Sequence, residues 1–159
     1  FRELTEQELM DLGISGSQFT NAFSGMLSQA SPQNFAAFTN TNGSFEVVVS
    51  VLMVPLTTLE GAAVDLYLAD PQRLANDFSS ASGATNLSID STAPSMGNSS
   101  SSATFVLPTA ALEMNGGVTV SRRGQVLQVA LLFYPAGTTP TLTSSTVAEI
   151  VDAKLSNLD

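Results

Sequence analysis

The sequence contains no cysteine, no histidine and no tryptophan, and only five of its 159 residues are basic. Without an imidazole or a thiolate, the chain cannot assemble a Ser-His-Asp triad or a Cys-His nucleophile. The usual ligands of zinc, haem and iron–sulfur centres are missing as well, and no Asp-x-Asp-x-Asp-Gly calcium loop occurs. We therefore expect no metal and no cofactor.

The scarcity of basic residues also bears on the partners. The net charge is -9, and the five basic residues are Arg2, Arg73, Arg122, Arg123 and Lys154. Such a chain repels phosphate backbones and forms no basic stripe, so we expect no nucleic-acid partner. Long apolar runs are absent too, because the longest, Val47 to Leu56, is broken by Ser50 and Pro55. We expect no transmembrane segment in these residues.

Hydroxyl side chains are abundant, with 21 serines and 16 threonines, whereas only 12% of the residues are charged. This bias is more usual outside the cytoplasm than in a bacterial cytosolic enzyme. The sequence begins at Phe1 rather than at methionine, which is compatible with an upstream signal or lipid anchor. We expect an extracytoplasmic, membrane-associated location: periplasm, thylakoid lumen or cell surface.

The N-terminal segment carries two successive helix signals. Thr5 and Glu8 have the spacing of a capping box, and Gly13 follows as a stop. Ser15 begins the second signal, and Pro32 closes it. Apolar residues at helical spacing lie between these two, namely Phe19, Ala22, Phe23, Met26, Leu27 and Ala30. We predict two N-terminal helices in a helical segment over residues 1–32.

The remaining chain alternates strand and helix patterns. Strands are predicted at 34–38, 44–54, 87–90, 103–107, 118–122 and 125–134, with a tight hairpin at Arg123-Gly124. Three helices are predicted: one capped by Thr57 and Glu60, one from Asp70-Pro71 to Gly83, and one from Thr143 or Ser144 onward. In the first of these, one face carries Leu59, Ala62, Ala63, Leu66 and Tyr67. The serine-rich stretch within 83–102 is predicted to be an exposed, mobile loop.

This order favours an α+β fold, in which an antiparallel sheet of about five or six strands is covered by helices. We assign residues 33–159 to one sandwich domain. The stretch VSRRGQVLQVALLFYPAG at 120–137, followed by VAEIVDAKL at 147–155, resembles PsbP-like α/β/α-sandwich proteins that are secreted or lipid-anchored in bacteria. The resemblance implies a sheet hairpin followed by a helix on the sheet. It also implies a generally non-enzymatic role outside the cytoplasm, in some proteins on photosynthetic membrane complexes.

Two groups of residues are candidates for partner binding. Arg122 and Arg123 form the one adjacent basic pair. Their guanidinium groups either clamp a carboxylate or an acidic patch of a partner, or form a polar hairpin end that balances the acidic surface. The other group is aromatic and comprises Phe19, Phe23 and Met26, together with Phe35 and Phe38. These residues belong either to the core or to a docking surface. The carboxylate pairs Asp65 and Asp70, and Glu149 and Asp152, suit acid–base chemistry or ordinary capping and surface charge.

The sequence therefore predicts a non-enzymatic, extracytoplasmic accessory domain that binds a protein, with a membrane complex as the expected partner. An alternative is a small-molecule or lipid-binding module with an apolar pocket between sheet and helices. A third hypothesis is a hydrolase that uses carboxylates alone, which would need two of them facing each other in a cleft.

Overall fold

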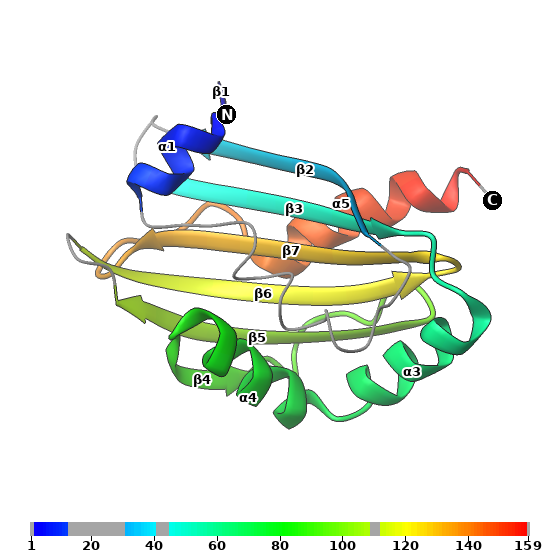
Figure 1. Ribbon diagram of the computed structural model, residues 1–159. Coiled ribbons are helices and arrows are strands. Elements are labelled where there is room, and N and C mark those ends of the chain that lie inside the picture. The colour runs from blue at the N-terminus through cyan, green and yellow to red at the C-terminus, as the bar shows by residue number, and fades with distance from the viewer. Residues whose placement is uncertain (1, 13–30, 41–44, 109–111, 159) are drawn as a thin grey trace.

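The computed structural model describes residues 2–12, 31–40, 45–108 and 112–158. Within these residues, seven strands form one antiparallel sheet in the order β1-β2-β3-β7-β6-β5-β4 (Figure 1). The strands are β1 (Arg2–Glu3), β2 (Ser31–Asn40), β3 (Glu46–Val54), β4 (Thr85–Ile89), β5 (Ser99–Pro108), β6 (Glu113–Arg123) and β7 (Val126–Pro135). The helices are α1 (Glu6–Asp11), α3 (Thr58–Leu68), α4 (Pro71–Ser82) and α5 (Ser144–Ser156).

The predicted α+β class is confirmed, but the sheet is larger than the predicted five or six strands. The prediction missed β1, which is only two residues long and pairs with Thr39 and Phe38 at the outer edge of β2. Two residues are too few to show the period-2 pattern by which strands are recognised. The N-terminal helix within the described residues is α1, whereas the second predicted helix, over residues 15–30, lies outside them.

Helix boundaries follow the predicted capping signals closely. Thr5 with Glu8 and Thr57 with Glu60 both form complete capping boxes, and Thr143 accepts a hydrogen bond from the Thr146 amide. Gly83 ends α4 in the left-handed conformation, at φ +75°. The expected cap at Asp70 is absent: α4 begins at Pro71, but the Asp70 side chain makes no capping hydrogen bond.

The helices lie on opposite faces of the sheet (Figure 1). In this view α1, α3 and α4 are in front of the sheet and α5 is behind it. Strand β3 shows both layers, because Val47, Val49 and Val51 belong to the core cluster that includes residues of α3 and α4. Val48, between them in the sequence, belongs to the cluster that includes Val147 and Ala148 of α5. Successive side chains of a strand point to opposite faces, so this almost continuously apolar strand serves both cores.

The N-terminal residues belong to the front core rather than to a separate body. Leu4 and Leu9 are buried in the cluster that contains the valines of β3, and the Leu4 amide donates to the Ala37 carbonyl at 2.8 Å. The described part of the 1–32 segment therefore packs onto the sheet.

Two local predictions are wrong. Ser99–Ser102, predicted to be part of a mobile loop, forms the first part of β5. The Ser102 hydroxyl lies 2.8 Å from that of Thr119, so hydrogen bonds replace apolar burial there. In α3, Leu59 and Leu66 are exposed, whereas Val64, Tyr67 and Leu68 are buried. This helix is apolar on both sides, so its pattern did not reveal which face the sheet covers.

Three neighbouring strands place a phenylalanine, a glycine and a second phenylalanine side by side on the front face. Phe105 on β5 is opposite Gly116 on β6, and Gly116 is opposite Phe133 on β7. The two phenyl rings meet edge to face with their centroids 5.7 Å apart. A Cβ atom at position 116 would lie 2.6 Å from the Phe105 ring and 2.7 Å from the Leu132 carbonyl oxygen. The glycine therefore provides the space in which the rings meet.

Among the described residues, no helix combines the length and apolar character needed to cross a bilayer.

We predict that Gly116→Ala destabilises the protein by about 1–3 kcal/mol, because the added methyl group overpacks a site bounded partly by backbone. Thr104→Ala, at an exposed position of the neighbouring strand β5, should change the free energy of unfolding by less than about 0.5 kcal/mol. Urea denaturation of both variants measures the difference. Equal stability of the two would show that the rings do not meet over position 116.

Candidate apolar groove and its supporting ion pairs

An apolar groove lies on the back face of the sheet, between α5 and strands β2 and β3. Its volume is about 250 Å³. The residues that line it are Phe38, Val48, Ser50, Leu142, Val147, Ile150 and Val151. We refer to this set as the α5 groove.

The groove exists because α5 covers only part of the back face. Thr119 and Gln128 lie under the helix, and both hydrogen-bond to α5 residues. The back-facing side chains of β2 and β3 continue beyond the area of the sheet that α5 covers. Phe38 is directly opposite Val48 on the neighbouring strand, and it is 36% exposed. Ile150 of α5 is 52% exposed. The apolar surface therefore continues from the helix onto the sheet.

The lining has the character of a binding surface for apolar groups. Ser50 is the one hydroxyl-bearing residue in the set, and the other lining residues are apolar. Drug-sized ligands usually occupy pockets of about 300–1,000 Å³, so the groove suits one or two apolar side chains or a short hydrocarbon segment. Contact with such groups would remove Phe38 and Ile150 from water.

A buried carboxylate fixes the segment that leads into α5. Glu46, at the start of β3, is fully buried and accepts hydrogen bonds from the Thr141 amide and from the Thr141 hydroxyl, the latter at 2.6 Å. Burial raises the pKa of Glu46, but the hydrogen bonds from Thr141, Asn40 and Leu142 outweigh it and hold the pKa below the ordinary value. Leu142 is thereby placed at one end of the α5 groove.

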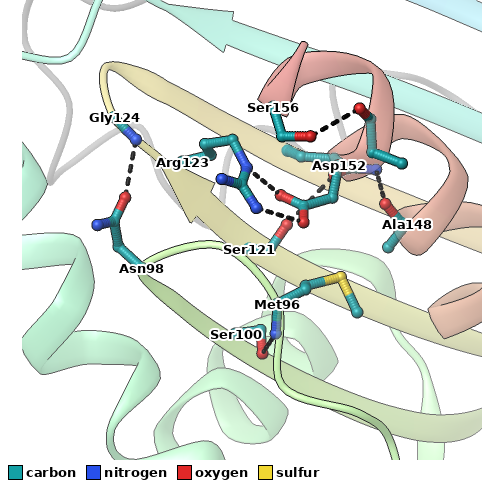
Figure 2. A network of polar contacts seen from close by, with 11 residues as sticks. Met96, Asn98, Ser100, Ser121, Arg123, Gly124, Ala148, Asp152 and Ser156 are labelled. Atoms are coloured by element: carbon teal, nitrogen blue, oxygen red, sulfur yellow. Dashed lines mark hydrogen bonds and ion pairs between the residues drawn. The ribbon is translucent and has the colours of Figure 1, made fainter. Parts of the chain in front are cut away.

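Arg122 and Arg123 lie at the end of β6, beside the turn at Gly124. Because neighbouring side chains of a strand point to opposite faces, the two guanidinium groups reach different layers. Arg122 donates from Nε and one terminal nitrogen to the carboxylate of Asp65 on α3, at 2.8 and 2.6 Å. Arg123 forms the same two-pronged contact with Asp152 on α5, at 2.7 Å for both bonds (Figure 2).

Both aspartates have a lowered pKa for the same reason. Hydrogen bonds from Arg122 lower the pKa of Asp65, and hydrogen bonds from Arg123 lower that of Asp152, in each case against the opposing effect of burial. The Asp152 side chain is only 12% exposed, whereas that of Asp65 is 38% exposed. The arginines differ in the opposite direction, with 16% of the Arg122 side chain and 29% of the Arg123 side chain exposed, so both pairs are partly shielded from water.

Further bonds join this corner to the loop before β5. Figure 2 shows the Asn98 side chain accepting a hydrogen bond from the Gly124 amide at 2.8 Å, and the Met96 amide donating to Ser100. The Asn98 amide donates to the Arg122 carbonyl at 2.6 Å. The end of the hairpin, the loop and the two helices form one connected polar network.

The residues predicted to bind a partner do not all lie within the described part of the chain. Phe19, Phe23 and Met26 lie outside the described residues. Arg122 and Arg123 are at the hairpin end, and the carboxylates they hold are Asp65 and Asp152 of the same chain. One member of each carboxylate pair considered from the sequence, Asp65 in the first and Asp152 in the second, is bound to an arginine. No group of three or more carboxylates suited to a metal ion occurs among the described residues.

Sequence reasoning did not locate the α5 groove. Phe38 and Ile150 were each visible as apolar residues of predicted elements, but the groove depends on which part of the sheet α5 covers. The period-2 pattern of β3 indicates two apolar faces and carries no information about partial coverage.

We predict that Asp152→Asn destabilises the protein by about 1.5–3 kcal/mol at pH 7, because a largely covered Arg123 loses its charged acceptor. The aspartate pKa is depressed on folding, so its contribution is present above about pH 3.8 and is lost as the pH falls through the lower folded value. The stability difference from the wild type should accordingly shrink below that pH.

Glu149→Gln is the matched control, since Glu149 is an exposed residue one turn earlier on the same helix. Its effect should stay within about 0.5 kcal/mol. Thermal unfolding between about pH 2 and 7 checks both variants. A pH-independent difference for Asp152→Asn would contradict the proposed charge contribution.

Comparison with known proteins adds no relative: a scan against family models and a search of curated proteins found no match to this chain.

Proposed function

We propose that the protein is a non-enzymatic accessory domain that docks on a protein partner through the α5 groove. The observation that carries this proposal is the partly exposed apolar lining of the groove, with Phe38 and Ile150 at its open side. Contiguous exposed apolar surface of this kind is typical of interaction sites. The small volume favours side chains of a partner over a complete ligand.

The charge of the chain defines the chemistry of the partner. Three of the five basic residues, Arg2, Arg122 and Arg123, are engaged in ion pairs within the chain. The outward field of a chain with net charge -9 is therefore acidic, and it would repel an acidic partner. We infer that the occupant is an amphipathic helix of another protein, with apolar side chains facing the groove and lysines or arginines beside them.

The location belongs to the same proposal. The hydroxyl-rich, charge-poor composition and the resemblance of residues 120–137 and 147–155 to PsbP-like proteins support a place outside the cytoplasm, at a membrane-associated complex. A photosynthetic complex is the specific partner that this resemblance suggests.

A second candidate function is the binding of a single hydrocarbon chain in the same groove. It is favoured by the composition of the lining, in which six of the seven residues are apolar. Native mass spectrometry of protein isolated from its source separates the two functions. A stoichiometric polypeptide supports docking, and a small bound mass supports the hydrocarbon ligand.

We predict that an amphipathic helical peptide of leucine and lysine with one tryptophan binds the wild-type protein, and that Ile150→Asp weakens this binding at least about tenfold. The loss of apolar contact and the burial of a new carboxylate oppose docking. Because the chain contains no tryptophan, the fluorescence of the peptide alone reports binding.

Leu158→Asp is the matched control, since Leu158 is 81% exposed, is not part of the groove and undergoes the same change in charge. Non-specific attraction of a basic peptide would increase equally in both variants, because each is more acidic than the wild type. Tighter binding to Ile150→Asp than to the wild type would contradict docking at the groove.

A further inference from the structure

Helix α3 carries apolar side chains on the side that faces away from the sheet. Its sheet-facing side is buried through Val64, Tyr67 and Leu68. On the outer side, Leu59 and Leu66 are 80% and 78% exposed, and Ala62 is exposed between them. Ala69, at the C-terminal cap, is also exposed and continues this line. We call Leu59, Ala62, Leu66 and Ala69 the α3 seam.

The spacing of the seam is that of a helix-pairing surface. Its members follow one another at intervals of three, four and three residues, which is the a-to-d spacing of the heptad repeat. Leucines alternate with alanines along it. A large residue on one helix therefore needs a small residue opposite it on a second helix if the two are to pack closely.

The four side chains of the seam are uncharged, although the chain is strongly acidic. Helix α3 contains two acidic residues, Glu60 and Asp65, and no basic ones. Glu60 is buried and accepts the Thr57 amide in the capping box, whereas Asp65 is ion-paired with Arg122. The exposed Asp70 directly follows the seam. Two chains of net charge -9 repel each other, so salt should affect their association here.

We propose that the α3 seam binds a second copy of this chain, with the two α3 helices antiparallel about a two-fold axis. In this arrangement Leu66 packs against Ala62 of the second copy, and Leu59 packs against Ala69 of the second copy. The axis generates each contact twice, as in other isologous interfaces. The pattern of two leucines and two alanines is complementary to itself only in this antiparallel register.

Two physical factors favour a second copy of the chain as the binding partner of the seam, and one limits the affinity of the dimer. The helices are already ordered by the fold, so pairing requires little new ordering, and antiparallel helices align their dipoles favourably. The interface is short, however, because an 11-residue helix is only about 16 Å long. We expect a weak dimer, with a dissociation constant in the range of about 1–100 μM.

The first test is sedimentation analysis of the full chain over a range of concentrations. We predict a species with the mass of two chains at high concentration, and at least a tenfold weaker association for Leu66→Asp. Leu158→Asp, at a comparably exposed leucine, should associate like the wild type. Association should tighten as NaCl is raised from about 0.02 to 0.3 M, because salt screens the repulsion between two acidic chains.

The second test establishes the register. Because the native chain contains no cysteine, only the introduced cysteines can form disulfides. An equimolar mixture of Ala62→Cys and Leu66→Cys chains should form the mixed disulfide under mild oxidation in clear excess over the 1:2:1 ratio that random pairing gives. Mass spectrometry distinguishes the three products. Leu158→Cys measures the background from random collision.

Several results would overturn the proposal. A chain that is monomeric at all concentrations, or a dimer that Leu66→Asp leaves intact, excludes the seam as a site of self-association. A statistical 1:2:1 mixture of the disulfides, or a preference for the homodimeric ones, excludes the antiparallel register. Seam-dependent binding of a different protein by a monomeric chain would assign the surface to that partner instead.

Discussion

Two neighbouring arginines at the end of β6 hold helices against opposite faces of the sheet. Arg122 binds Asp65 of α3 through two hydrogen bonds, and Arg123 binds Asp152 of α5 in the same way. The two arginines reach opposite faces because side chains alternate along a strand. Two consecutive residues are therefore sufficient to anchor a helix on each face of the sheet. Each fork-to-carboxylate contact also fixes orientation, which a single apolar contact does not. The positions of α3 and α5 relative to the sheet depend on this corner.

The α5 groove is a consequence of how α5 is anchored. Three polar contacts tie it to β6 and β7: Ser144 bonds to Thr119, Gln128 donates to the Ala148 carbonyl, and Asp152 binds Arg123. The α5 residues that line the groove on the side of β3 are apolar, namely Val147, Ile150 and Val151. Moving α5 across to cover β2 and β3 would break several buried hydrogen bonds, so the adjacent sheet surface stays open.

Much of the local structure was predictable because its causes are local. The capping boxes at Thr5 and Thr57 and the left-handed glycine at Gly83 depend on residues within one turn. The errors concern tertiary contacts. Ser99–Ser102 lacks apolar residues, but it is held in β5 by pairing with β6. Hydrogen bonds also join the hydroxyls of Ser99 and Ser102 to Asp65 and Thr119 on other elements. The arginine pair was predicted to bind an acidic patch of a partner. Its contacts with Asp65 and Asp152 depend on how α3 and α5 are brought to β6, a relation between residues at least 29 positions apart.

The α5 groove and the α3 seam lie on opposite sides of the sheet, which decides whether they can be used together. Pairing through α3 would cover the outer side of that helix and leave the back, including Phe38 and Ile150, accessible in each copy. A two-fold dimer would then present two identical grooves, and a partner with two suitable helices would be held by both at once. Such bivalent attachment raises the apparent affinity without any new contact, because the second binding event takes place at a high local concentration. Two weak surfaces, one on each side of the sheet, could thus give firm and reversible attachment to a larger assembly.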